Sequence, residues 1–155
     1  MTHFQCLSFS ELSLDQLYAV MALRQEVFVV EQDCPYLDAD GSDQKGWHLL
    51  GENATGELVA YARLLPQGVT YEKYASIGRV VNAKSVRGQG LGQQLMQEAI
   101  AHYQRLLPNV PLKISAQCYL LKFYTNLGFN AVGEEYLEDG IPHIGMVYAT
   151  SVNEH

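Results

Sequence analysis

The chain has 155 residues, of which 48% are hydrophobic and 17% are charged. This balance suits a packed globular domain and excludes intrinsic disorder, and the length predicts one domain spanning residues 1–155. Ten lysines and arginines oppose 17 acidic residues, a net charge of -7, which excludes broad nucleic-acid binding because phosphate neutralisation needs the opposite sign.

The cysteine, histidine and hydropathy patterns narrow the protein class further. The three cysteines form no CxxC pair and the five histidines have no ligand-like spacing, so we expect neither a disulfide framework nor a metal site. No apolar run reaches the roughly 18 residues that a membrane span requires, and no basic, apolar leader follows Met1. We therefore expect a cytoplasmic protein that binds no membrane.

The first half of the chain predicts a helix and an antiparallel sheet. Ser13 and Gln16 have capping-box spacing, and apolar residues then recur at helical spacing as far as Phe28. The acidic segment 31–46 contains proline and glycine, which predicts a loop. Strands are expected at 4–9, 47–52, 58–65 and 74–82. The strand 58–65 is expected to be central, because its apolar and polar residues hardly alternate. Gly78 would permit a bulge in the strand 74–82.

The second half predicts two helices and three further strands. The main helix spans 91–107, where apolar side chains form one stripe and Pro108 follows. A short helix over 119–127 ends at Gly128, since glycine tolerates the left-handed conformation of a C-cap. The remaining strands are expected at 112–117, 129–136 and 143–148. The predicted fold class is α/β (α+β), with a mixed, mostly antiparallel central sheet flanked by helices.

A glycine-rich turn lies between the fourth strand and the main helix. Its residues are Arg87, Gly88, Gln89, Gly90, Leu91 and Gly92. Glycines let backbone N–H groups turn toward an anion, and the N-terminus of the following helix adds positive potential, so the turn suits a diphosphate. The spacing fits neither a Walker A loop nor the dinucleotide fingerprint. Alone, it is equally compatible with a tight helix start that binds nothing.

A second motif lies downstream, where Phe123-Tyr124 is followed by Leu127-Gly128-Phe129. With the glycine-rich turn, which has the pattern Q/R-x-x-G-x-G/A, it resembles the GNAT superfamily of acyl-CoA-dependent N-acetyltransferases. Three other segments are similar to the ElaA-type branch of that superfamily: 24–32, 34–40 and 138–146.

The resemblance implies direct transfer of an acetyl group from acetyl-CoA, without a metal, to an amine of a small molecule or a peptide. It implies that the backbone of Arg87 to Gly92 takes the pyrophosphate. The pantetheine arm would pair with the strand segment Arg79-Val80-Val81, whose N–H groups could polarise the thioester carbonyl. Gln117 replaces an asparagine that the family often has, and Lys122 is either a phosphate contact or a solvated helix lysine. Homodimers are common in the family.

The chemistry also needs an acid and a base. By resemblance, Tyr124 is the general acid that protonates the leaving thiolate; the alternative is an ordinary half-buried tyrosine. A lysine-like amine has a pKa of about 10.4, so on the order of one molecule in a thousand is neutral at pH 7. Glu31 and His143 are the candidate bases, and each has a simpler interpretation as a solvated acid or a packing histidine.

Other interpretations remain open at this point. A non-catalytic acyl-CoA-binding or sensing domain would bind the nucleotide without releasing free thiol, and an interaction module would use the acidic segment 31–46. Arg24 is expected to pair with that segment. The acids at 31–43 and 134–139 would attract a cationic amine, although they also serve solubility.

Overall fold

The computed structural model describes residues 2–149, and these build one seven-stranded sheet in the order β1-β2-β3-β4-β5-β7-β6. Strands β1 to β4 are antiparallel neighbours, β4 and β5 are parallel, and β7 is antiparallel to both β5 and β6. The predicted mixed, mostly antiparallel sheet is thereby confirmed. The strands are β1 His3–Ser8, β2 Trp47–Glu52, β3 Leu58–Leu65, β4 Ala75–Asn82, β5 Leu112–Gln117, β6 Phe129–Glu138 and β7 Ile141–Tyr148.

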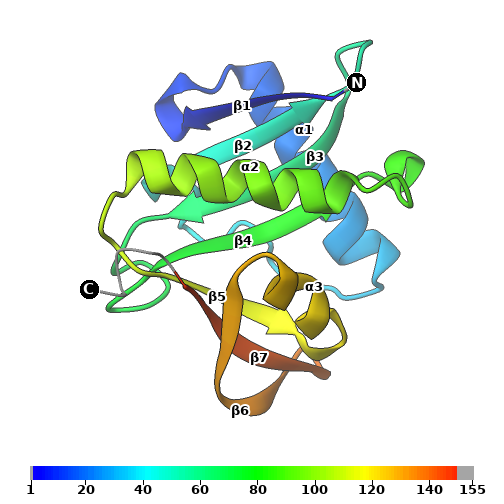
Figure 1. Ribbon diagram of the computed structural model, residues 1–155. Helices are drawn as coiled ribbons and strands as arrows, with labels where there is room; N and C mark the ends of the chain where they lie inside the picture. The colour runs from blue at the N-terminus through cyan, green and yellow to red at the C-terminus, as the bar shows by residue number, and fades with distance from the viewer. Residues whose placement is uncertain (1, 150–155) are drawn as a thin grey trace.

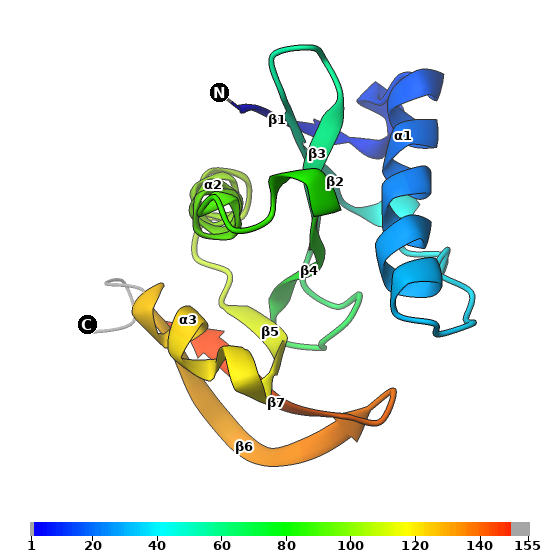
Figure 2. The same ribbon diagram turned by 90° about the vertical axis from the view of Figure 1, so that its right-hand side faces the viewer.

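Helices cover both faces of the sheet. Figures 1 and 2 show α1 (Leu14–Arg24) and α2 (Leu91–Leu106) on opposite faces of the first four strands, and α3 (Leu121–Asn126) beside β5, β6 and β7. Helix α1 continues as a π-helical stretch, Gln25–Glu31. The start of α1 has the predicted capping box, in which the backbone N–H of Gln16 donates to Ser13 Oγ at 3.0 Å. None of the helices formed by residues 2–149 is long and apolar enough to cross a membrane.

Two hydrophobic clusters hold the helices on the sheet. On one face, α2 buries Leu95, Met96 and Ala99 completely, as its apolar stripe predicted. On the other face, Val20, Leu23 and Val27 of α1 and its extension pack on Leu50, Tyr61 and Val81. Burying one such aliphatic side chain contributes about 1.5–3 kcal/mol, so both helices are tied to the strands that carry the site.

The central strands confirm two predictions and correct one detail. Strand β3 is buried from Val59 to Leu65, as a central strand should be. The predicted bulge in β4 is present, because Tyr61 pairs with Val81 whereas Arg63 pairs with Gly78, which leaves one additional residue in β4. The left-handed residue of the bulge is Arg79, with φ +51°, rather than the glycine before it.

The C-terminal hairpin is longer than expected. Strand β6 runs to Glu138 and β7 begins at Ile141, so the predicted strand ends at 136 and 143 were wrong. Asp139 and Gly140 both have positive φ, 53° and 77°, the conformation of a two-residue hairpin turn. The acidic run before this turn and the proline after it look like a loop, but pairing between β6 and β7 extends through them.

The predicted helix over 119–127 is divided in two. A 3₁₀ turn, Cys118–Leu120, precedes α3, which ends one residue earlier than expected. Gly128 has φ +108° and confirms the predicted glycine at the helix end. The ring of Tyr148 packs so close to this glycine that a Cβ would lie 2.9 Å from it.

Candidate active site

A cleft opens where β4 and β5 separate. The two parallel strands pair only at their starts, through Ala75 with Leu112 and Ser76 with Lys113. Beyond that point no strand formed by residues 2–149 pairs with β4 on the β5 side, while β5 pairs with β7 along its opposite edge. The splay leaves backbone N–H and C=O groups of β4 free for a ligand that adds to its edge.

The cleft contains a cavity of about 240 Å³. Its walls come from β4, β5, α3, the β6–β7 hairpin and the segment that follows α1. The lining residues are Phe28, Gln32, Tyr36, Ile77, Gly78, Arg79, Val80, Ser115, Gln117, Leu120, Tyr124, Glu138, Asp139, Ile141 and His143. Three residues predicted for the cofactor site, Arg79, Val80 and Gln117, thus lie around one cavity together with the predicted acid Tyr124 and the candidate base His143.

The bulge in β4 is held by an acidic partner from outside the sheet. Nε of Arg79 donates to Oδ1 of Asp38 at 2.8 Å, and its Nη2 donates to the Asp38 carbonyl at 3.1 Å. Asp40 lies 3.4 Å from the same guanidinium, which also stacks over the Tyr36 ring at 5.9 Å from its centroid. The segment after α1 is therefore clamped against β4, and Tyr36 becomes a wall of the cavity.

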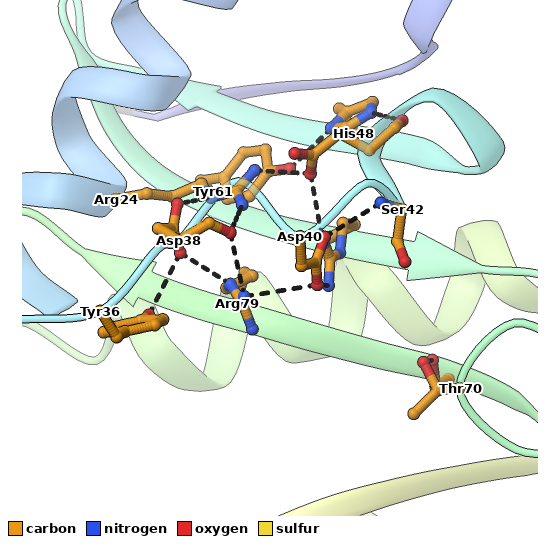
Figure 3. A network of polar contacts seen from close by, with 12 residues as sticks. Arg24, Tyr36, Asp38, Asp40, Ser42, His48, Tyr61, Thr70 and Arg79 are labelled. Carbon is orange, nitrogen blue, oxygen red and sulfur yellow. Dashed lines mark hydrogen bonds and ion pairs between the residues drawn. The ribbon is translucent and has the colours of Figure 1, made fainter. Parts of the chain in front are cut away.

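A buried ion network continues this clamp into the core (Figure 3). Arg24, which is 0% exposed, contacts Asp38 at 2.8 Å and Asp43 at 2.7 Å, so the predicted pairing with the acidic segment is confirmed. Arg63 bonds to both Asp40 and Asp43, at 2.8 and 2.9 Å. The hydrogen bond from Arg63 holds the pKa of Asp40 well below its usual range.

The same network includes a buried histidine. Nε2 of His48 donates to the Asp43 carbonyl at 2.9 Å, so its Nδ1 accepts from the Tyr61 hydroxyl at 2.6 Å. Burial lowers the pKa of His48 and keeps the imidazole neutral. The network pairs Asp38, Asp40 and Asp43 with three arginines, and the acidic segment consequently offers less free negative charge to a cation than its sequence suggests.

The glycine-rich turn has the backbone that an anion site needs. Gly88 and Gly90 have φ of 82° and 75°, and apart from their chain neighbours no heavy atom of residues 2–149 lies within 4 Å of where either Cβ would be. Gly90 is also the N-cap of α2 and supplies no side-chain acceptor to the first N–H groups of the helix. The open turn thus fits a pyrophosphate. Leu91 is buried, so it can contribute only its backbone.

Glu31 lies at this turn, and it does not line the cavity. Its carboxylate forms an ion pair with Arg87, including an Nη2–Oε2 hydrogen bond of 3.1 Å, and Arg87 also donates to the Asn82 carbonyl at 3.3 Å. The hydrogen bond from Arg87 lowers the pKa of Glu31. A carboxylate in this position neutralises the arginine expected to meet a phosphate.

Tyr124 is packed by aromatic rings at the cavity wall. Phe123 and Phe129 meet its ring edge-on, with centroids 5.1 and 5.9 Å away. Burial raises the pKa of Tyr124 to about 12, so the phenol keeps its proton at neutral pH and can donate a hydrogen bond. Lys122, on the same helix, is exposed and lies outside the cavity lining.

His143 reaches the cavity from the start of β7 and is 6% exposed. Its Nδ1 lies 2.7 Å from the Ile141 carbonyl, and its Nε2 lies 3.5 Å from Oε2 of Glu138. The imidazole stacks on Tyr136, with centroids 6.1 Å apart and planes at 25°, and Tyr136 in turn hydrogen-bonds Ser115. The strand register sets His143 opposite Gln117.

The sequence did not point to the wall formed by Phe28, Gln32 and Tyr36. These residues precede β4 by about 40 to 50 positions, and the ion network holds their segment over the strand. Within the described part of the chain, no three or more histidine, cysteine, aspartate or glutamate side chains gather as they would around a metal ion.

Known proteins share this arrangement. The family model of the acetyltransferase (GNAT) domain matches residues 16–150. Protein ElaA of Escherichia coli strain K12 is 48% identical over 148 residues, which cover 94% of this chain and 95% of ElaA. A crystal structure of an acyl-CoA N-acyltransferase from Pseudomonas aeruginosa is 47% identical with a TM-score of 0.90, covering 96% of this chain and 100% of that one.

The crystal structure of Escherichia coli ElaA is similar as well, with 45% identity, a TM-score of 0.89 and the same coverage of both chains. The residues matched by the family model, 16–150, include the glycine-rich turn, β4, β5 and the β6–β7 hairpin. With its sheet, its cleft and its relatives in agreement, the chain belongs to the GNAT superfamily of acyltransferases, in the ElaA-type branch.

Proposed function

We propose that this protein transfers the acetyl group of acetyl-CoA directly to the nitrogen of an amine. The observation that carries the proposal is the cavity between β4 and β5, where Tyr124 and Gln117 face a free strand edge. A thioester bound along that edge would meet a hydrogen-bond donor on one side and an open volume for the amine on the other.

The glycine-rich turn would hold the cofactor at its pyrophosphate. The segment 87–92 lies at the N-terminus of α2, where the helix dipole adds positive potential, and the space beside Gly88 and Gly90 is open. The pantetheine arm would extend β4 as an added strand along Arg79, Val80 and Val81. An N–H group of the same bulge would polarise the thioester carbonyl, and Lys122 would remain near the nucleotide phosphates.

Tyr124 would act on the sulfur as the C–S bond breaks. Its pKa of about 12 exceeds the ordinary thiol value of about 8.5 by roughly 3.5 units, so complete proton transfer costs about 5 kcal/mol. This difference favours a hydrogen bond from Tyr124 that strengthens as charge develops on the sulfur. The proton then moves to the sulfur late in the breaking of the C–S bond. Acetyl-CoA supplies the activated acyl group, and the chain positions it.

Free-thiol release from acetyl-CoA against a panel of primary amines tests the proposal. We expect turnover by the wild type and a decrease in kcat on the order of 100-fold in Tyr124→Phe, with the thermal shift caused by CoA retained. Tyr119→Phe is the matched control, because Tyr119 is 77% exposed and lies outside the cavity lining.

Two results would contradict the proposal. Binding of CoA without turnover on a broad panel would instead support a non-catalytic acyl-CoA-binding domain. An unchanged kcat of Tyr124→Phe at every pH would mean that Tyr124 takes no part in the chemical step.

A further inference from the structure

The tip of the β6–β7 hairpin carries a histidine whose tautomer the backbone determines. Nδ1 of His143 lies 2.7 Å from the carbonyl oxygen of Ile141. A carbonyl oxygen can only accept a hydrogen bond, so Nδ1 carries the proton. In the neutral imidazole, Nε2 is then the unprotonated nitrogen, free to accept a proton or a hydrogen bond.

Nε2 faces a second acceptor. Oε2 of Glu138 lies 3.5 Å away, on a side chain that is 53% exposed, whereas the side chain of His143 is 8% exposed. A lone pair and a carboxylate oxygen this close repel each other unless a proton lies between them or a donor binds to both. A primary ammonium group has three donors and a positive charge, and so can satisfy both atoms at once.

We infer that the acceptor amine binds as a primary ammonium between Glu138 and Nε2 of His143, and that His143 takes its proton. This inference rests on the proposed acetyl transfer. Glu138 holds the cation, and Nε2 removes one N–H proton to free the nitrogen lone pair. The nitrogen then forms its bond to the acetyl carbon while the C–S bond breaks.

The protons balance across this sequence. The proton on His143 returns to water after transfer, and the second nitrogen proton replaces the one that Tyr124 gives to sulfur. One ammonium and one thioester thus give one amide, one thiol and one released proton. No oxidant, metal or further co-reactant takes part.

The charges around the cavity specify the substrate class. Glu138 and Asp139 contribute negative charge from the hairpin, and the positive charge of Arg79 is already met by Asp38 and Asp40. The groups that face His143 are Glu138 and Tyr136 of β6 and Gln117 of β5. An amine that carries a carboxylate near its nitrogen would be repelled, whereas an uncharged alkyl stem would meet the apolar wall of Phe28, Tyr36 and Ile141.

Glu31, the other candidate base, is placed for a different role. It forms an ion pair with Arg87 at the glycine-rich turn and lies outside the cavity lining. The hydrogen bond from Arg87 also lowers its pKa, which makes the carboxylate a weaker base.

Steady-state kinetics with n-butylamine and 3-aminopropanoate test the inference. We expect the wild type to prefer n-butylamine, and Glu138→Gln to raise the KM for n-butylamine about fivefold while kcat changes little. His143→Gln should lower kcat about 100-fold near pH 7. The ratio of wild-type to His143→Gln kcat should fall about tenfold per pH unit toward pH 10. At higher pH more of the amine is already neutral, so less of it needs a base. Glu134→Gln, an exposed acid on β6 outside the cavity lining, should behave as the wild type.

Nitrogen NMR of the imidazole gives a readout that needs no turnover. We expect an Nδ1–H tautomer for His143 and a shift of its Nε2 resonance when n-butylamine is added to the complex with CoA. An Nε2–H tautomer, or turnover by His143→Gln with an unchanged pH profile, would overturn the inference. Absence of thiol release by the wild type with every amine would overturn the proposed function instead, and the Nε2 shift would still decide whether an ammonium binds here.

His143→Gln removes a buried, stacked ring, so its folding is checked through the thermal shift caused by CoA. If that variant does not fold, the test uses Glu138→Gln, since the Glu138 side chain is half exposed on a strand whose residues 130–138 are all exposed. An unchanged KM for n-butylamine in Glu138→Gln would then overturn the inference.

Discussion

Removing the charge of Asp43 should destabilise the protein strongly. The carboxylate of Asp43 accepts from Arg24 at 2.7 Å and from Arg63 at 2.9 Å, and the three side chains are at most 6% exposed. In Asp43→Asn both guanidinium groups remain buried without their shared counter-charge. Breaking a buried pair from one side costs about 3–5 kcal/mol. Because asparagine keeps one acceptor oxygen, we expect the lower end, about 3 kcal/mol.

Thermal unfolding measures this loss. For a chain of 155 residues, 1 kcal/mol corresponds to about 2–4 °C, so the Tm of Asp43→Asn should fall by about 6–12 °C. Asp33→Asn is the matched control, since Asp33 is exposed in the same segment and asparagine tolerates its φ of +50°. We expect that control to stay within about 0.5 kcal/mol of the wild type.

The pH dependence provides a second readout. Burial would raise the pKa of Asp43, but the hydrogen bonds from Arg24 and Arg63 outweigh it and lower the pKa. A carboxyl group whose pKa is lower in the folded state than in the unfolded chain stabilises the fold above about pH 4, and this contribution is lost as the pH falls below that value. The Tm difference between wild type and Asp43→Asn should therefore shrink toward pH 3. A variant within about 1 kcal/mol of wild type at pH 7 would refute the reasoning.

Two further predictions concern the glycine-rich turn. Gly90→Ala forces an L side chain into a φ of 75°, so we expect the affinity for CoA, measured by calorimetry, to fall about five- to tenfold. The control is Gly68→Ala, at a glycine with φ 93° and equally open surroundings in a turn before β4, and it should leave the affinity unchanged. Glu31→Gln frees Arg87 from its exposed ion pair, so the affinity for CoA should rise by less than about fivefold at low salt, and by less still at high salt. Equal loss in both glycine variants, or a lower affinity in Glu31→Gln, would contradict the assignment of this turn to the cofactor.

Local patterns in the sequence were sufficient for the elements whose stability is local. The stripe of α2, the capping box at Ser13 and the glycine after α3 were all confirmed, because helix periodicity and capping depend on neighbours within a few residues. The glycine-rich turn was also recognisable, since positive φ and exposed N–H groups are local properties. The Asp139-Gly140 pair is also typical of a two-residue hairpin turn, but the acidic residues before it look like part of a loop.

The tertiary structure alone decided what surrounds the cavity. The partners of Arg79 lie about forty residues away in the chain, so no local pattern could show that Asp38 and Asp40 neutralise it and clamp Tyr36 against β4. The choice between Glu31 and His143 likewise depended on where long-range packing carries each side chain. The sequence by itself determined where the helices, most strands and the glycine-rich turn form, because those depend on near neighbours. The walls of the cavity depend on contacts between distant segments, and only folding brings those together.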